Sequence, residues 1–410
     1  MLSSCGDDDP CANFLCPTGT TLSEVDGNCD CVELQPSEDV IMKFGLIDTD
    51  EVWTADNIYQ LNGKVVVNTG ATLSIEPGTI IKGAEGTGSL ASALIVARGG
   101  IINACGTPEA PIVMTSTLDN IQVGQTAGTN LDVSQNGLWG GLIVLGNAPG
   151  SFEGDVSEFQ IEGIPADDTF GLYGGDDPAD NSGSLCYISL RHGGASIGEN
   201  NEINGLTLGG VGSGTTINQI EIVSNLDDGI EFFGGTVNLT NAIVWSQGDD
   251  GFDADQGYSG TLSNFVYIAG EDSDHGLEID GPEGSAQGRF TFENGTLIGL
   301  RAEIADFRKA SMGQVNDCVV INFPDDADLE IDDDESSANY FSGLLEITGF
   351  EFVSSLSVSE LVHDFAPSGD DVAFDAQMEM NNASVSISTK GANVDVFSWT
   401  YAFSKGVLSF

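Results

Sequence analysis

From about Asn57 onward, the chain alternates short apolar runs with turns rich in Gly, Asn and Pro. The runs, for example residues 64–67, 71–75 and 94–97, are rich in Val, Ile, Leu and Thr. β-Branched residues of this kind favour strands. No helix-period segments lie between the runs, which argues against β-α-β units. The pattern therefore predicts an all-β fold made of many short strands.

Three segments in the middle of the chain, residues 222–232, 244–255 and 268–280, repeat one pattern: an apolar run, an acidic turn, a glycine and an alternating strand. The shared glycines are Gly229, Gly251 and Gly276, which gives periods of 22 and 25 residues. A repeat of this length without a helix predicts a β-solenoid. We expect a parallel β-helix over residues 48–336, right-handed by the general rule for parallel connections, and closing coils with a cap over 337–410.

After each shared glycine, side chains are expected to point alternately into and out of the coil. The outward positions are mostly acidic, and stacked coils place equivalent residues about 4.8 Å apart. The sequence therefore predicts three vertical files, which we call the acidic ladder. The first file holds Glu231, Asp253, Glu278, Asp306 and Glu330. The second holds Asp255, Asp280, Arg308 and Asp332. The third, at the preceding turn, holds Asp227/Asp228, Asp249/Asp250 and Asp274/His275.

Neighbouring carboxylates in such a ladder repel one another, by on the order of 3 kcal/mol per pair at about 5 Å and an effective dielectric near 20. Bridging Ca²⁺, protonation of some carboxyls or neutralisation by Arg308 would each relieve the repulsion. The candidate Ca²⁺ ligands are Asp228, Glu231, Asp250, Asp253, Asp255, Glu278 and Asp280. A plainer interpretation is that the acids form turns and a solvated face, because Asp favours turns.

A catalytic interpretation places Asp227, Asp249 and Asp253 beside Arg308, in the manner of a Ca²⁺-dependent polysaccharide lyase or a glycoside hydrolase. His192 and His275 show no metal-ligand spacing, and each is expected to be a packed or surface residue. The sequence contains no nucleophile elbow, phosphate-binding loop or catalytic Cys/His pair.

The charge balance is extreme: 11 Lys and Arg stand against 64 Asp and Glu, so the net charge is 11 − 64 = −53. Such a surface repels nucleic acid and anionic membranes and attracts cations. A saline habitat would explain the same composition without any binding function.

The N-terminal sequence predicts an exported, anchored protein. Residues 2–5, Leu-Ser-Ser-Cys, resemble a lipobox, which makes Cys5 the expected lipidation site, and residues 1–10 the anchor and acidic tether. Residues 11–35 carry four cysteines and resemble a degenerate EGF-like module that has lost two cysteines. The alternative is a zinc site, but Cys-X-Cys without a second matching pair is a poor zinc pattern. The expected disulfide cysteines are Cys11, Cys16, Cys29 and Cys31, with three possible pairings. Cys105, Cys186 and Cys318 are expected to be buried single thiols. No apolar stretch of about 20 residues is present, so nothing is expected to span a membrane.

Several glycine-rich strings support this location. The strings EINGLTLGGVGSGT at 202–215 and DDGIEFFGGTVN at 227–238 resemble a family of secreted, Bacteroidetes-type β-helix proteins of unknown function. The resemblance covers roughly residues 57–299. It implies a β-helix on the outer-membrane surface and transfers no catalytic residue. Some family members are labelled transporters, which a β-helix without a spanning segment cannot be.

These observations lead to three hypotheses about function. The first is a non-enzymatic surface protein that binds glycan, protein or cation through the acidic face and the loops at 119–169 and 176–181. It predicts exposed aromatic side chains beside the ladder, for which Tyr258 and Trp245 are the nearest candidates. The second is a Ca²⁺-dependent carbohydrate-active enzyme. The third is an accessory subunit of an outer-membrane complex, which predicts an exposed apolar patch.

Overall fold

The structure is a computed structural model that describes residues 20–25, 28–33, 40–165, 168–196, 202–300 and 303–408. The chain divides into two compact units, Met1–Asp39 and Val40–Phe410. In the first unit, β1 (Thr20–Val25) and β2 (Asn28–Glu33) form an antiparallel hairpin. Cys5, Cys11 and Cys16 lie outside the described residues, and of Cys29 and Cys31 only the backbone in β2 is described. The lipidation and the four-cysteine pairing therefore stay predictions.

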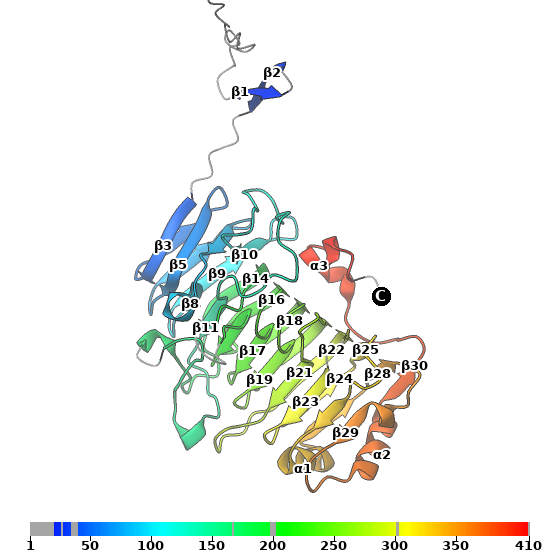
Figure 1. The fold of residues 1–410 in the computed structure, drawn as a ribbon. Coiled ribbons are helices and arrows are strands. Elements are labelled where there is room, and N and C mark those ends of the chain that lie inside the picture. The colour runs from blue at the N-terminus through cyan, green and yellow to red at the C-terminus, as the bar shows by residue number, and fades with distance from the viewer. Residues whose placement is uncertain are drawn as a thin grey trace, which may run out of the picture. The chain divides into compact units, whose positions relative to one another are not determined.

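The second unit is a parallel β-helix, as the repeat predicted (Figure 1). Each coil contributes strands to three parallel faces. The face that carries the acidic ladder, which we call the acidic sheet, stacks β8 (Ala93–Val96), β11 (Leu142–Leu145), β15 (Leu206–Gly209), β17 (Ile230–Phe233), β19 (Phe252–Asp255), β21 (His275–Asp280), β23 (Glu303–Arg308), β26 (Leu329–Ile331) and β29 (Val362–Asp364).

The other two faces share long strands that bend at a corner. These strands are β14 (Gly183–Arg191), β16 (Thr216–Val223), β18 (Asn238–Trp245), β20 (Thr261–Ile268) and β22 (Phe290–Ile298). Further strands complete the faces: β3 (Val40–Ile47), β4 (Glu51–Trp53), β5 (Ile58–Val67), β6 (Thr72–Ile75), β7 (Ile80–Gly83), β9 (Ile101–Cys105), β10 (Ile112–Ser116), β24 (Gly313–Asn316), β25 (Val319–Ile321), β27 (Leu345–Thr348), β28 (Glu351–Val353) and β30 (Ala383–Val385).

Left-handed residues make the corner in the long strands. Asn241, Asn264 and Asn294 occupy it in three successive coils with φ of 62°, 57° and 58°. Asn tolerates this conformation better than most residues because its short side chain can bond locally. Asn264 also donates from Nδ2 to Oδ1 of Asn241 over 2.6 Å, which links the stacked corners.

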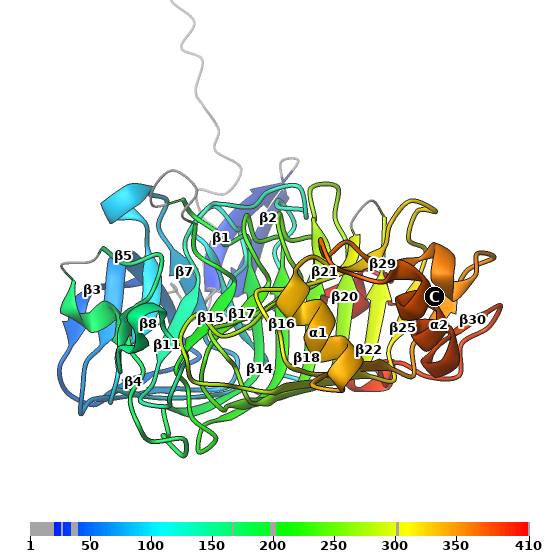
Figure 2. The same ribbon diagram turned by 90° about the horizontal axis from the view of Figure 1, so that it is seen from below.

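The inward positions fill a continuous core, as the alternation predicted. Ile230, Phe232, Phe252 and Leu277 are fully buried, and Phe252 packs edge-on against Phe265 at 5.2 Å. Helices α1 (Asp334–Ser342) and α2 (Asp371–Asn381) lie at the C-terminal end of the solenoid (Figure 2). Buried Tyr340 of α1 and Phe374 of α2 pack at 4.9 Å, and both belong to the main core.

Two of the three scattered cysteines are not single thiols. Cys105 at the end of β9 and Cys186 in β14 are register partners, and they form a disulfide with a Cα–Cα distance of 4.4 Å. The prediction of free thiols was wrong because coil stacking brings together residues that lie 81 positions apart in the chain. Cys318 is a buried free thiol, as expected.

After β30 the chain runs back along the solenoid to α3 (Tyr401–Ser404), a segment we call the C-terminal strap (residues 386–408; Figure 1). Its hydrogen bonds reach from Asn264 to Gln219 and to buried Glu221, which accepts from the N–H of Ala402 at 2.8 Å. Among the described residues, no helix has the length and apolar character that a membrane crossing needs.

Candidate functional site

The first file of the acidic ladder forms as predicted. In the strand register, Glu231 lies beside Asp253, Asp253 beside Glu278, Glu278 beside Asp306 and Asp306 beside Glu330. The file continues to His363 on β29, which sequence reasoning missed. The signal for His363 was weak because α1 and a longer connection interrupt the period before that coil.

The second and third files also stack. Asp280 and Arg308 are register partners on β21 and β23. At the preceding turn, Oδ1 of Asp228 accepts from the N–H of Asp250 at 2.9 Å. Oδ1 of Asp250 in turn accepts from the N–H of His275 at 2.7 Å and lies 2.9 Å from its Nδ1.

Seven acids of the ladder do not lie on a solvated face, whereas Asp249, Asp274 and Asp332 are exposed. Glu231, Asp253 and Asp306 are only 5%, 8% and 2% exposed. Asp228, Asp250, Glu278 and Asp280 are buried as well. The plain interpretation of an exposed acidic face was therefore wrong for these residues. Because the side chains stack at the spacing of the strands, each one shields its neighbours from solvent. A loop also covers the part of the acidic sheet around β11 and β17.

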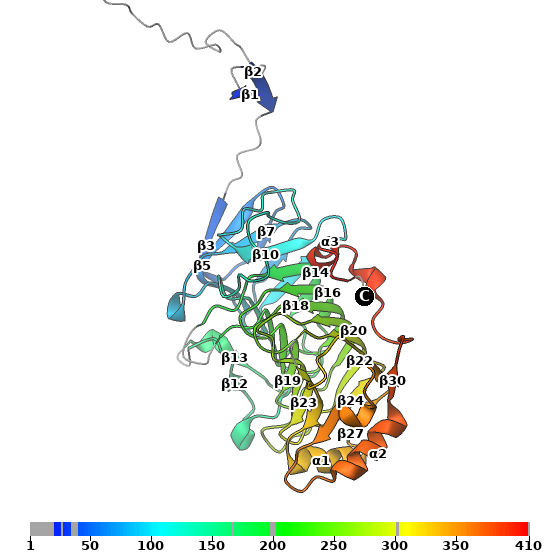
Figure 3. The same ribbon diagram turned by 45° about the vertical axis from the view of Figure 1, so that its right-hand side comes forward.

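That loop lies between β11 and β14 and includes the short strands β12 (Phe159–Gln160) and β13 (Leu172–Tyr173) (Figure 3). Its Phe152, Ile161 and Tyr173 pack in one cluster with outward-facing Ile143 and Phe233 of the acidic sheet. The N–H of Ser151 also donates to the carbonyl of Gln256 at 2.7 Å, just after β19. Part of the insert predicted as a binding loop therefore covers the ladder.

Burial and mutual repulsion raise the pKa of the ladder carboxyls. Desolvation, followed by the charges of neighbouring acids, holds the pKa of Asp228, Glu231 and Asp253 well above the usual range. The same causes raise the pKa of Asp227 to about 8. In Asp255, burial and Asp280 raise the pKa to about 7, although Lys309 opposes the shift.

Several buried oxygens on the acidic sheet have no hydrogen-bond partner among the residues that the structure describes. They are Oδ1 of Asn204, Asp253, Asp255 and Asp306. A buried polar atom left without a partner costs about 1–3 kcal/mol, and more if it is charged. A proton, a water molecule or a cation would satisfy these atoms.

The sheet brings metal-ligating atoms together in three groups. Within each group the ligand atoms lie within 4.8 Å of one another. The groups are Asp227/Asp228/Asp249, Asp228/Glu231/Asp253 and His275/Asp306/Glu330. Asp228 joins the first group, which reaches exposed Asp249, to the fully buried second group.

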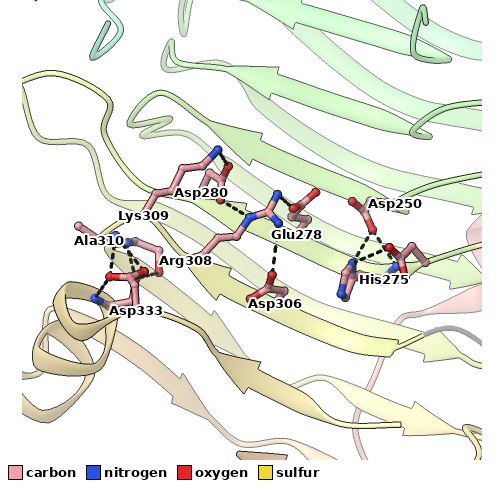
Figure 4. A network of polar contacts seen from close by, with 12 residues as sticks. Asp250, His275, Glu278, Asp280, Asp306, Arg308, Lys309, Ala310 and Asp333 are labelled. Atoms are coloured by element: carbon pink, nitrogen blue, oxygen red, sulfur yellow. Dashed lines mark hydrogen bonds and ion pairs between the residues drawn. The ribbon is translucent and has the colours of Figure 1, made fainter. Parts of the chain in front are cut away.

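Arg308 neutralises the neighbouring part of the ladder (Figure 4). It contacts Glu278, its Nε lies 2.7 Å from Oδ1 of Asp280, and its Nη1 lies 3.5 Å from Oδ2 of Asp306. Lys309 also pairs with Asp280. No ion pair between described residues reaches Asp228, Glu231 or Asp253. Among the described residues, the buried group on β17 and β19 therefore has no basic partner.

The residues of the catalytic interpretation do not converge. Asp227 and Asp249 share a group with Asp228, whereas Asp253 lies in the buried file. Arg308 stands two coils beyond Asp253, on β23, and three carboxylates already engage it.

The sequence of the solenoid matches one known protein family. The model of a family described as a pectate-lyase-like β-helix domain matches residues 45–404. The chain belongs to this pectate-lyase-like β-helix family. No curated protein and no solved structure matches it significantly. The match spans the coils and the strap.

In this pectate-lyase-like β-helix, the two aromatic residues that were predicted beside the ladder do not form an exposed platform. Tyr258 is buried, stacks on Phe232 at 4.4 Å and donates to the carbonyl of Val237 at 2.7 Å. Trp245 lies half-buried against Tyr401 of the strap, at 6.1 Å between ring centroids. Both candidates were therefore wrong, since the alternation could not reveal what covers each position.

A polar cavity of about 350 Å³ opens beside the third file. Asp132, Ser134 and Asn136 line one side, and Gln247 and Asp272 line the other. Gln247 also donates to the carbonyl of Asp249 at 3.1 Å, so the cavity adjoins the exposed end of the acidic groups. The loop between β10 and β11, which the sequence marked as a candidate binding surface, forms one wall.

Proposed function

We propose that this protein is a non-enzymatic binding protein of the cell surface that holds Ca²⁺ in its acidic sheet. One observation carries the proposal: Asp228, Glu231 and Asp253 are buried together without a basic partner among the described residues. Three carboxylates this close need a counter-charge if they are to be ionised together, and Ca²⁺ prefers oxygen ligands.

The neighbouring atoms fit a hard cation. Oδ1 of Asp253 and Oδ1 of Asn204 are buried oxygens for which no described residue serves as a hydrogen-bond partner. Asn204 donates from Nδ2 to Glu231, and this hydrogen bond places the side-chain amide of Asn204 beside the same group. Bound Ca²⁺ would supply the positive charge that keeps the three carboxyls ionised. The group has no nitrogen or sulfur ligand, which favours Ca²⁺ over softer ions.

The ligand of this surface is proposed to be a glycan held in the adjoining cavity. Carboxylates, amides and hydroxyls line this cavity, and these groups hydrogen-bond sugar hydroxyls. Asp227 and exposed Asp249 connect the cavity side with the buried group. The family to which the chain belongs is compatible with a carbohydrate-related role.

Binding is favoured over cleavage because of Arg308. A polysaccharide lyase needs a basic residue free to take a proton from the sugar, beside the bound cation. Three carboxylates engage Arg308, on coils beyond the proposed Ca²⁺ group. Cleavage by a lyase or a hydrolase is the alternative function. Release of unsaturated sugars by the wild-type protein would establish a lyase, and release of new reducing ends alone would establish a hydrolase.

Surface attachment through Cys5 completes the proposal. The Leu-Ser-Ser-Cys motif at residues 2–5 supports a lipid anchor. The Cys105–Cys186 disulfide supports an exported protein, because such bonds persist in oxidising compartments.

Thermal melting of the full chain at constant ionic strength, in EDTA and across a Ca²⁺ titration, tests the Ca²⁺ site. Ligand at 100 times its Kd stabilises the native state by about 2.7 kcal/mol. We expect a rise in Tm with Ca²⁺ that Glu231→Gln and Asp253→Asn abolish. Exposed Glu109 provides the matched control, because Glu109→Gln removes one charge outside the ladder. If Ca²⁺ raised Tm equally in all three variants, the rise would be due to general charge screening and not to a Ca²⁺ site.

One observation favours the accessory-subunit hypothesis as a second candidate. Strand β3 exposes Val40, Met42, Phe44 and Leu46, each about half exposed or more. A row of exposed apolar side chains is typical of a protein contact. Crosslinking on intact cells would test it, with Phe44→Glu expected to abolish a specific partner band that wild type gives.

A further inference from the structure

A nitrogen-containing group of metal-ligating atoms lies on the coils that follow the proposed Ca²⁺ group. His275 begins β21, Asp306 lies in β23 and Glu330 lies in β26. One ligand atom from each lies within 4.8 Å of the others. Asp306 and Glu330 are register partners, and His275 stands in the neighbouring file. Figure 4 shows His275 and Asp306 on this part of the sheet.

Asp306 supplies an oxygen that lacks a partner. The residue is only 2% exposed, and its Oδ1 accepts no hydrogen bond from any described residue. Its other oxygen, Oδ2, lies 3.5 Å from Arg308, so the ion pair leaves Oδ1 unused. Since a buried carboxylate oxygen is costly without a donor or a cation, this atom is available to a bound cation.

Asp250 orients His275 as a ligand. Oδ1 of Asp250 lies 2.9 Å from Nδ1 of His275 and accepts from its backbone N–H at 2.7 Å. Metal-ligating histidines usually donate their second ring nitrogen to a carboxylate in this manner. Although burial lowers it, the hydrogen bond to Asp250 and the charges of the surrounding acids raise the pKa of His275 to about 9, so a metal ion must displace a proton before Nε2 can serve as a ligand.

We propose that Nε2 of His275 and carboxylate oxygens of Asp306 and Glu330 bind a first-row divalent cation of the Zn²⁺ type. An imidazole with two carboxylates favours such an ion over Ca²⁺, which takes oxygen ligands. Ligands about 2.0–2.2 Å from a tetrahedral ion stand roughly 3.5 Å apart, so ligand atoms that lie within 4.8 Å of one another need only a small movement to bind the ion. Half-buried Glu330 leaves a path from solvent. This site is separate from the proposed Ca²⁺ group and does not depend on it.

Calorimetric titration of the full chain with Zn²⁺, in saturating Ca²⁺, tests the site. Wild type is expected to bind one Zn²⁺. His275→Gln and Glu330→Gln should each weaken binding at least 100-fold, and Asp250→Asn should weaken it about 10- to 100-fold as a positioning residue. Glu231→Gln should bind Zn²⁺ as wild type does, which separates this site from the Ca²⁺ group.

The matched control is His192→Asn. His192 lies in the coil of β14, and its Nδ1 contacts the carbonyl of Gln135 at 2.7 Å. Asn suits its left-handed φ of 60°. This variant should retain full Zn²⁺ affinity, and melting curves confirm that each variant is folded.

Cu²⁺ provides a spectroscopic test of the nitrogen ligand. Electron paramagnetic resonance of the Cu²⁺-loaded chain should show coupling to one imidazole nitrogen, which His275→Gln removes and His192→Asn keeps. Zn²⁺ binding that His275→Gln and Glu330→Gln leave unchanged, or a folded wild type that binds no Zn²⁺, overturns the proposal.

Discussion

Oδ1 of Asp250 accepts the backbone N–H of His275 at 2.7 Å and faces its Nδ1 at 2.9 Å, although the two residues lie 25 positions apart in the chain. One carboxylate thus fixes both the backbone and the side chain of the next coil. The contact fixes the turn at which the buried acidic groups begin.

The first prediction isolates these hydrogen bonds from the charge of Asp250. Both Asp250→Asn and Asp250→Ala remove one negative charge from the crowded ladder, but only Asn keeps an acceptor for His275. We expect Asp250→Ala to be less stable than Asp250→Asn by about 1–3 kcal/mol, measured by urea unfolding in EDTA. Equal stability of the two variants would mean that water replaces the lost acceptor.

The second prediction concerns pH in the absence of metal. Burial and neighbouring acids raise the pKa of Asp227 to about 8 and that of Asp255 to about 7. The folded state therefore holds protons that the unfolded state releases near pH 4. Their stabilising effect is complete below that pH and is lost as pH rises through 7 and 8.

The free energy of unfolding in EDTA should accordingly fall between about pH 5 and pH 8, and saturating Ca²⁺ should flatten or reverse the slope. Urea titrations at constant ionic strength measure it. A slope that rises with pH in EDTA would show that these carboxyls ionise without penalty in the folded state.

The third prediction concerns the Cys105–Cys186 disulfide. It closes a loop of 81 positions that includes the cover of the acidic sheet. The chain-entropy relation gives about 4–5 kcal/mol for a loop of this size, and measured losses are commonly about 2–5 kcal/mol. Cys105→Ser/Cys186→Ser should lose stability in that range. Cys318→Ser, which affects only a free buried thiol, provides the comparison. Reducing agent should lower the stability of Cys318→Ser, which keeps the disulfide, and should leave the stability of the double variant unchanged.

The fourth prediction concerns the repeat glycines. A Cβ on Gly251 would lie 2.4 Å from the ring of Tyr267 and 2.6 Å from the carbonyl oxygen of Gly276. Gly251→Ala should cost about 1–3 kcal/mol by overpacking. Gly343 has open space around it and φ of 75°, so Gly343→Ala should cost only backbone strain of about 1–2 kcal/mol. Thermal melting of both variants checks the order.

The sequence was sufficient to predict the solenoid because each coil repeats the same local pattern of apolar and polar positions. Alternation assigned Phe232 to the core and Glu231 to the opposite face, and the repeat length set Glu231 beside Asp253. Register follows from such patterns because a slip of one residue would turn every apolar side chain outward. The first file could therefore be predicted residue by residue.

Other features depend on contacts between distant segments. The burial of Asp253 and the enclosure of Tyr258 come from neighbouring coils and loops, and the Cys105–Cys186 bond joins strands on either side of a long insert. The glycines at 229, 251 and 276 were expected to serve turns, yet Gly251 lacks a Cβ because a ring and a carbonyl of other coils occupy the space. The local sequence pattern around a residue does not indicate which distant segments will contact it.

The sequence by itself determined the strand period, the inward and outward faces and the acidic files, since these follow from alternation and repeat length along one segment. Only the tertiary structure decided which acids are buried, which oxygens lack partners and where His275 points. Those properties depend on the dielectric and on the donors around each side chain, and coils and loops distant in the chain supply both.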